Sequence, residues 1–497
     1  MIMGIGLLIL VQVGKQNLYL SAQPEITFFK IAYKRYTNFS IEPTPQYFKT
    51  TPDFGRKCTV NIGRNADLVG ACYLYVTLPS IMMENYSSNA TNVKSFAWVE
   101  KIGFALINYI EIEIGGTIID RQYGDWLNIW QELVLPLNLK NAGNKMIGNT
   151  PELTSYTKTK QSTILYIPLG FWFCLDTGLA LPLISLLHND VKIHVEFNDL
   201  STCYKLSPSY YITINNNYCL LKPGEYFYQN YQNNKVIGEF VYFDQINQNL
   251  YYNPVKGTFI VPSTNNDPNY VLTGTSTQFK INITPNTVVV QDTDYFQFNK
   301  PSLISAYILT NYIYLDNFER TFFINNTNQY LIPIIQTLPD QIIYSINSTY
   351  KLPLYNPIKL IVWRVCLISN IVNNNTFNYT SYPYTSNVIP LINNNLLVIN
   401  STNRIDLSDI QYYTEIQKYQ YNIPSQQEGI YMYSFALNPK DITPSGSMNF
   451  SRIDDAYIQV TLNNIVNYQN PVSMRAYAVQ YNIFRASNGI GGLVYNI

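Results

Sequence analysis

The sequence predicts an all-β protein, on the basis of alternating apolar and polar residues, short apolar runs and frequent turn residues. Residues 109–114 alternate strictly, meet Gly115 and Gly116, and continue as a second apolar run from Thr117. This pattern is typical of a β-hairpin with one solvated face. Most apolar runs are short and end in clusters of Asn, Pro, Gly or Ser, which favours sandwiches or barrels.

Further strands follow from the same periodicity. Residues 191–197 alternate over seven positions, whereas 360–363 and 476–479 are continuous apolar runs suited to central strands. Helix is scarce, and the best candidate is residues 125–133, in which Asp125 is the expected N-cap. Its apolar face contains Trp126, Ile129, Trp130 and Leu133. Asn-rich polar stretches predict loops at 85–92, 138–149, 265–269 and 373–384.

The composition indicates more than one hydrophobic core and a surface with little charge. A chain of 497 residues exceeds the roughly 250–300 residues at which a single core stops growing. Charged residues make up only 13%, about half of the usual share, while Asn, Gln, Ser, Thr and 44 tyrosines supply the polarity. A subunit that is surrounded by neighbours tolerates such a surface. Lysine plus arginine balance aspartate plus glutamate at 32 each, without a dense basic run, which argues against direct contact with nucleic acid.

The cysteines and histidines do not indicate a metal or a cofactor. The six cysteines form no CxxC pair and are expected to be free thiols: Cys58, Cys72, Cys174, Cys203, Cys219 and Cys366. On a strand, His188 and His194 would lie on one side but about 20 Å apart, too far for one ion. No dinucleotide, phosphate or nucleophile-elbow motif is present.

Two pairs of carboxylates raise the question of glycoside cleavage. Glu111 and Glu113 would lie on one strand face about 6.6 Å apart, and a β-sandwich glycosidase needs such a pair. The simpler interpretation places both on the solvated side of an amphipathic strand. Asp454 and Asp455 would point to opposite faces. The sequence therefore names no catalytic residue and predicts that the chain is not an enzyme.

The N-terminal segment is expected to be an arm. Residues 5–13 are apolar except for Gln12, and nine residues are too few to cross a hydrocarbon core. No basic residue precedes them and no small-residue cleavage site follows, so a signal peptide fits poorly. The segment is expected to dock on a partner or on its own domain, with contact to a membrane as the alternative.

Blocks along most of the chain share their order with a known family. They include QPEITFFK at 23–30, YKRYTNFSIE at 33–42, DWLNIW at 125–130, IPLGFWF at 167–173, YMYSFAL at 431–437 and YNIFR at 481–485, together with 110–120, 180–184, 312–316, 329–332, 356–359 and 449–454. In this combination they resemble the major capsid proteins of nucleocytoplasmic large DNA viruses. Residues from about 199 to 299 match no block and are expected to be an insertion with strands of its own, such as 235–243. The stretch 318–328 is less basic than the family usually shows.

The resemblance implies a double jelly roll: two consecutive eight-stranded jelly rolls with long loops and few short helices. It implies an arm at 1–24, a first jelly roll at 25–325 containing the insertion at about 199–299, and a second at 326–497. Both the insertion and 373–384 are expected to face outward.

The resemblance also implies a structural function in the virion, as a homotrimeric, pseudo-hexameric capsomer of an icosahedral shell assembled in the host cytoplasm. The implied partners are neighbouring capsomers, minor capsid and penton proteins, and the inner viral membrane through the arm. Two alternatives stay open. One is a minor capsid or vertex paralogue, and the other is a glycan-binding β-sandwich protein, which would need an aromatic pocket with convergent carboxylates.

Overall fold

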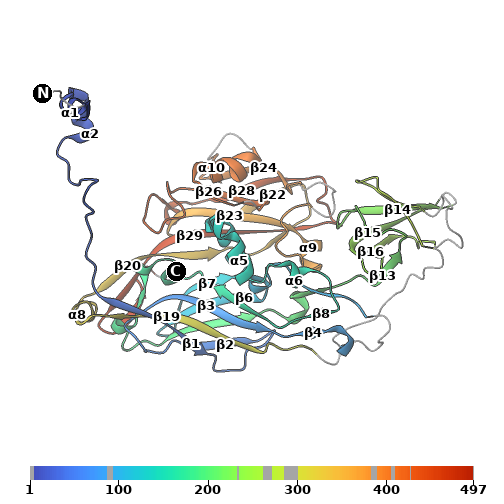
Figure 1. Cartoon of the computed structure of the whole chain (residues 1–497), viewed down its shortest axis with the longest axis horizontal. Coiled ribbons are helices and arrows are strands. Elements are labelled where there is room, and N and C mark those ends of the chain that lie inside the picture. Colours follow the sequence, from blue (N-terminus) through green and yellow to red (C-terminus); the bar gives the residue numbers. More distant parts are fainter. Residues whose placement is uncertain are drawn as a thin grey trace.

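The computed structural model describes residues 5–86, 93–231, 234–260, 271–284, 300–381, 389–403, 409–425 and 427–495. Strands dominate these residues and the helices are short (Figure 1). Of the predicted loops, 265–269 and most of 85–92 lie outside the described residues.

The first half of the chain forms a sandwich of two antiparallel sheets. One sheet has the order β1-β19-β3-β9, with β10 (Leu181–Pro182) also paired to β3, and the other has the order β2-β11-β6-β7. Numbered one to eight along the chain, the main strands have the orders 1-8-3-6 and 2-7-4-5, which is the jelly-roll topology. These strands are β1 (Phe39–Tyr47), β2 (Lys57–Asn61), β3 (Leu68–Leu78), β6 (Ile107–Ile114), β7 (Thr117–Tyr123), β9 (Thr163–Pro168), β11 (Val191–Phe197) and β19 (Ser305–Leu315).

The second half repeats this topology. Its sheets have the orders β20-β29-β23-β26 and β22-β28-β24-β25, which are again 1-8-3-6 and 2-7-4-5. The strands are β20 (Asn328–Thr337), β22 (Asn347–Lys351), β23 (Pro357–Leu367), β24 (Ile392–Ile399), β25 (Thr402–Asn403), β26 (Ile430–Ser434), β28 (Ala456–Leu462) and β29 (Val472–Ser487). The prediction of two consecutive eight-stranded jelly rolls is confirmed.

Alternation of side chains fills each sandwich. On β3, Leu74 and Val76 are buried in the core, whereas Tyr73 and Tyr75 on the opposite face are only half-buried. The predicted strands at 191–197, 360–363 and 476–479 are confirmed as β11 and as parts of β23 and β29. The predicted hairpin joins β6 to β7, and both of its glycines have positive φ values, +58° and +87°, as a type I′ turn requires.

A separate sheet lies between the seventh and eighth strands of the first jelly roll. It forms the end of the molecule opposite the arm (Figure 1) and has a core of its own around Phe227, Phe240 and Tyr252. The predicted strand at 235–243 is confirmed as β15. The sheet has the order β13 (Tyr210–Thr213), β16 (Asn249–Lys256), β15 (Asn234–Asp244), β14 (Tyr226–Tyr231), β17 (Val271–Gly274), β18 (Lys280–Asn282).

Two helical predictions had different outcomes. Helix α4 (Gly124–Val134) confirms the predicted helix, although its N-cap is Tyr123 and the Asp125 carboxylate binds other residues. The loop predicted at 138–149 is wrong, because η3 (Leu137–Leu139) and α5 (Lys140–Met146) occupy most of it. Gly143 and Ile147 lie four positions apart and are both buried, so packing of one helix face outweighs the weak helix propensity of the Asn-rich sequence.

Candidate functional site: the joint between the jelly rolls and the exposed surfaces

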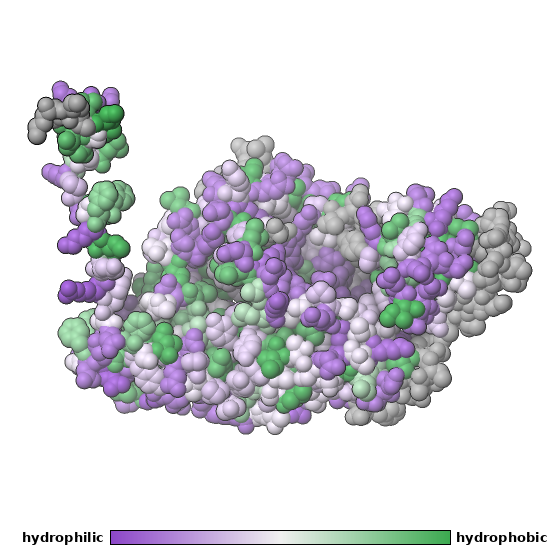
Figure 2. All heavy atoms as spheres, viewed as in Figure 1, coloured by the Kyte–Doolittle hydropathy of each residue, from purple (hydrophilic) through white to green (hydrophobic). Residues whose placement is uncertain are grey.

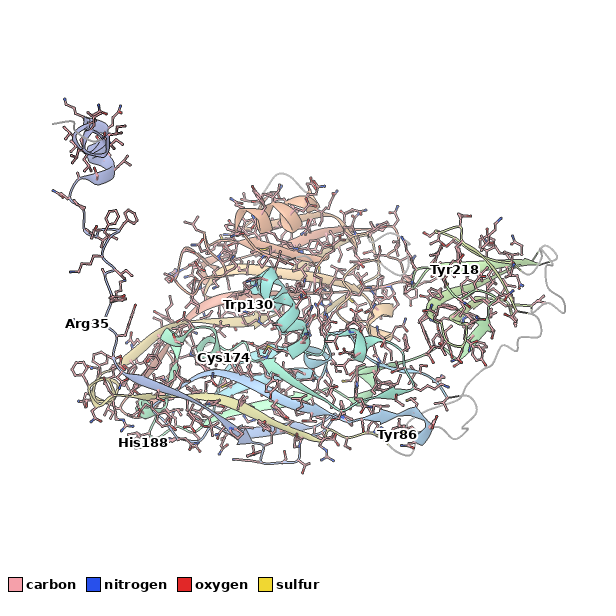
Figure 3. All side chains as sticks on the ribbon, in the orientation of Figure 1. Arg35, Tyr86, Trp130, Cys174, His188 and Tyr218 are labelled. Atoms are coloured by element: carbon pink, nitrogen blue, oxygen red, sulfur yellow. The ribbon has the colours of Figure 1, made fainter. Side chains whose placement is uncertain are left out.

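Helix α4 joins the two jelly rolls. It leaves the fifth strand of the first jelly roll and covers the outer face of the sheet β20-β29-β23-β26 in the second, in the middle of the molecule (Figure 3, Trp130). Trp126, Ile129 and Leu133 are at most 1% exposed there. They pack with Leu360, Val362, Met432, Tyr477 and Val479. This burial fixes the relative position of the two sandwiches by the hydrophobic effect.

A buried ion pair reinforces the joint. The Asp125 carboxylate accepts hydrogen bonds from Arg364 Nε at 2.8 Å, from the Tyr477 hydroxyl at 2.9 Å and from the Tyr379 hydroxyl. Arg364 also contacts Asp340 at 3.3 Å. The side chains of Asp125 and Arg364 are 9% and 5% exposed, so the pair is almost fully removed from water.

The electrostatics keep this pair charged. Burial opposes ionisation of Asp125, but the Arg364 charge and the hydrogen bonds outweigh burial and hold the pKa of Asp125 below its ordinary value. Burial also disfavours the Arg364 cation, yet the charge of Asp125 raises the pKa of Arg364. Burial, followed by the Asp125 charge, raises the pKa of Tyr379 and of Tyr477. Both hydroxyls therefore remain donors at neutral pH.

A second buried carboxylate at the joint, Asp120, has a raised pKa instead of a lowered one. Asp120 on β7 is 2% exposed and accepts hydrogen bonds from the Ile335 amide of β20 at 3.3 Å and from Gln122 Nε2 at 2.7 Å. Burial raises the pKa of Asp120 to about 6, because the loss of hydration outweighs the hydrogen bonds that its carboxylate accepts.

The structure corrects the prediction for Glu111. Glu111 and Glu113 share one face of β6, but Glu111 is only 1% exposed. It pairs with Arg121 on the adjacent strand β7 and with Lys57 on β2, which lies beyond β11 in the same sheet. Glu113 pairs with Lys192 Nζ at 2.7 Å and with His194 Nε2 at 2.8 Å. Hydrogen bonds from these two side chains lower the pKa of Glu113. Each carboxylate is thus held by cationic neighbours, and they do not form an acid and base pair.

The two histidines lie in different elements, and the cysteines are not bonded to one another. His194 lies on β11, whereas His188 lies in the turn before it, near the C-terminal hairpin that includes Gly489 (Figure 3). The six cysteines are free thiols, and four of them are buried. Within the part of the chain that the structure describes, no cluster of three or more His, Cys, Asp or Glu side chains suits a metal ion.

A polar cavity of about 250 Å³ lies beside the joint. Its charged lining consists of Asp125, Asp340, Arg364 and Arg475, which bind one another; Arg475 lies 2.6 Å from Asp340. The two carboxylates and two guanidinium groups balance one another, so the charged lining has no net charge.

The stretch 373–384 also belongs to the joint. Asn374 Nδ2 donates to the backbone carbonyls of Ser201 and Tyr204 at 2.6 and 2.8 Å, and Tyr379 is 1% exposed. The expectation of an outward-facing loop is wrong for this buried part; residues 382–384 lie outside the described residues.

The arm is the most exposed apolar segment. Helix α1 (Ile5–Val11), η1 (Lys15–Asn17) and α2 (Leu18–Ser21) project from the body, and residues 5–43 are all exposed (Figure 1). Apolar side chains gather at its tip (Figure 2), where Ile5 is 80% and Leu10 73% exposed. The arm therefore does not dock on its own domain. None of the helices in the described ranges is long and apolar enough to span a membrane.

Sequence reasoning missed the buried partners at the joint. Arg364 lies within the apolar run LIVWRVCL at 360–367, and a charged residue inside such a run is the signal of a buried ion pair.

Removing one member of the ion pair is expected to destabilise the protein strongly. Asp125→Ala leaves the Arg364 cation and two tyrosine hydroxyls without their main acceptor, so a loss of about 3–5 kcal/mol in unfolding free energy is expected by chemical denaturation. Asp454→Ala, the same substitution at an exposed aspartate, is the matched control with an expected loss of less than about 1 kcal/mol. Equal effects of the two variants would contradict the structural role of the joint.

Asp120→Asn is expected to gain stability relative to the natural protein as the pH rises. Because its folded-state pKa is raised to about 6, the protonated Asp120 supports the fold below about pH 4, and this support is lost as the pH rises through about 6. The stability difference between the variant and the natural protein should therefore grow by about 2 kcal/mol from pH 4 to pH 7. Thermal unfolding across this range measures it, with exposed Asp454→Asn as control. A constant difference would disprove the assignment.

Comparison with known proteins places the chain in a family. The description "Major capsid protein N-terminus" matches residues 27–244, and "Large eukaryotic DNA virus major capsid protein" matches 319–492. The chain is 35% identical to probable capsid protein 4 of Acanthamoeba polyphaga mimivirus and 28% identical to the major capsid protein of Phaeocystis pouchetii virus, each over 99% of both chains. The solved Faustovirus major capsid protein shares the fold with a TM-score of 0.66 and 13% identity, over 95% of this chain and 94% of that one. The chain belongs to the major capsid proteins of large eukaryotic DNA viruses and is a component of the virion capsid.

Proposed function

We propose that three copies of the chain form a homotrimeric capsomer with a pseudo-hexagonal outline, and that these capsomers tile an icosahedral shell. The observation that carries this proposal is the repetition of one strand order, 1-8-3-6 and 2-7-4-5, in both halves of the chain. Three copies supply six similar sandwiches around a threefold axis. Six similar units approximate a hexagon, the outline that fills a flat facet.

In the proposed capsomer, the jelly rolls, the arm and the insertion have different roles. The jelly rolls at 25–325 and 326–497 form the tile and contact neighbouring capsomers and penton proteins. The arm at 1–24 reaches minor capsid proteins or the inner membrane beneath the shell, and its exposed Ile5, Leu10 and Leu20 support a contact of this kind. The insertion within about 199–299 faces outward, and assembly takes place in the host cytoplasm.

The proposed role is structural and involves no catalysis or cofactor. The pairing of Glu111 with Lys57 and Arg121 supports this, because a buried carboxylate whose oxygens are engaged by two cationic side chains is not free to contact a substrate. The same pairing counts against the glycan-cleaving alternative.

A minor capsid or vertex paralogue is the second candidate. It is favoured by the similarity to a relative that is numbered among several capsid proteins of its virus. Copy number in purified particles separates the two roles: an abundant band by gel densitometry supports the major protein, and a scarce band supports the paralogue.

The mass of the purified full-length protein in solution tests the capsomer proposal. Light scattering after size exclusion is expected to give three times 57.3 kDa, because two similar sandwiches per chain produce a sixfold-like ring from three chains. A monomer or dimer at micromolar concentration would contradict it.

Deletion of residues 1–13 tests the arm. Residues 5–13, the described part of this segment, belong to neither core, so the truncated chain should remain a soluble trimer with unchanged thermal stability. It should fail to form closed particles, as seen by electron microscopy of infected or co-expressing cells. Normal particles built from the truncated chain would refute the proposed role of the arm.

A further inference from the structure

We propose that the outer face of the sheet β1-β19-β3-β9 is covered in the capsomer by the helical segment Tyr412–Gln420 of a second copy of this chain. This inference rests on the proposed trimer and specifies which surfaces meet in it. The covering would repeat between copies the contact that α4 makes within each chain.

The outer face of this sheet carries an in-register row of tyrosines. Tyr47 pairs with Tyr307, Tyr307 with Tyr75, and Tyr75 with Tyr166, on the neighbouring strands β1, β19, β3 and β9. Their ring centroids are 5.6, 4.2 and 5.2 Å apart in that order, with the central pair stacked. Such cross-strand aromatic pairs form one continuous surface.

The next row on the same face is also largely apolar. It consists of Pro45, Leu309, Tyr73 and Pro168, paired in the same strand order. None of these side chains belongs to either jelly-roll core, and the outermost tyrosines remain open, with Tyr47 70% and Tyr166 40% exposed. Two adjacent rows of this kind form a patch poor in charge, as at the centre of a subunit interface.

The equivalent sheet of the second jelly roll shows what covers such a face. Its corresponding row is Thr337, Tyr477, Val362 and Met432, in the same strand order. Helix α4 packs on this row, with the Trp126 and Tyr477 rings 5.2 Å apart, and leaves Tyr477 fully buried. The same topological face is thus closed in one jelly roll and open in the other.

The second jelly roll has its own segment in the position of α4. Helices η8 (Tyr412–Ile416) and α10 (Gln417–Gln420) lie between its fifth and sixth strands, as α4 does in the first. Tyr413 is buried in its own core, whereas Ile416 and Tyr419 are 50% and 91% exposed. These two follow Tyr413 by three and six positions.

The joint-forming side chains of α4 show the same spacing. Leu127 is buried in its own core, and Trp130 and Leu133, three and six positions later, face the other jelly roll. The segment Tyr412–Gln420 therefore carries apolar side chains at the spacing by which α4 forms the joint, but in the single chain Ile416 and Tyr419 remain exposed.

The two surfaces lie on opposite sides of the molecule. In Figure 1, α10 lies at the top edge and β1 and β19 lie at the bottom. Opposite surfaces cannot meet within one chain, but they can meet head to tail between copies. Such heterologous contacts close into a ring of three when neighbouring copies are related by a rotation of about 120°, as in the proposed trimer.

Two single variants of the full-length chain test the inference. Tyr166→Lys and Tyr419→Lys each place a charge on one side of the proposed contact, at exposed positions that do not disturb the cores. Each is expected to raise the concentration of half-dissociation of the trimer at least tenfold in analytical ultracentrifugation, with an unchanged circular dichroism spectrum of the folded chain. Tyr468→Lys, at another exposed tyrosine, is the control and should leave the trimer intact.

Mixing the two variants gives the sharper result. One intact surface remains on each chain, so the mixture should form a one-to-one heterodimer that cannot close into a ring. Two results would overturn this inference and leave the capsomer proposal standing. In the first, the wild-type chain and both single variants are all trimeric. In the second, the variants dissociate but form no heterodimer when they are mixed. A monomeric wild-type chain would overturn both.

Discussion

The contact of α4 with the second jelly roll determines how the rest of the molecule is arranged. Two sandwiches in one chain form a useful tile only when their relative position is fixed, and a flexible link would let them tilt. The apolar side chains of α4 supply the main free energy of this contact. Asp125 and Arg364 constrain the alignment, because a displacement that separates them would leave two buried charges unpaired. The loop around Tyr379 completes the same contact from the second jelly roll.

Local patterns allowed the strands, the Gly115-Gly116 hairpin and α4 to be predicted, since period-two and helical periodicities reflect which side chains are buried. The double jelly roll itself came from the resemblance of ordered blocks. The predictions that were wrong concern residues whose environment is set by tertiary contacts. The buried position of Glu111 depends on Arg121 across the hairpin and Lys57 from a strand outside it, and the helix at Lys140–Met146 depends on packing of Ile147. The partners of Asp125 lie more than 200 positions away, beyond any local pattern.

Several of the charged residues in this protein lie close together in ion pairs. With few charged residues, the chain places several of them in buried or half-buried pairs on β6 and at the joint, and leaves wide surfaces to tyrosine, asparagine and threonine. Tyrosine suits surfaces that change from wet to dry, because its ring packs while its hydroxyl keeps a hydrogen bond.

The insertion has a consequence for variation of the particle. Its sheet has a core of its own and leaves the first jelly roll between the last two strands, so its packing is largely independent of the sandwich that carries it. In the outward orientation proposed above, mutations there should change the exterior of the virus without altering the lattice geometry. The same separation makes this segment a natural graft site for displaying foreign domains.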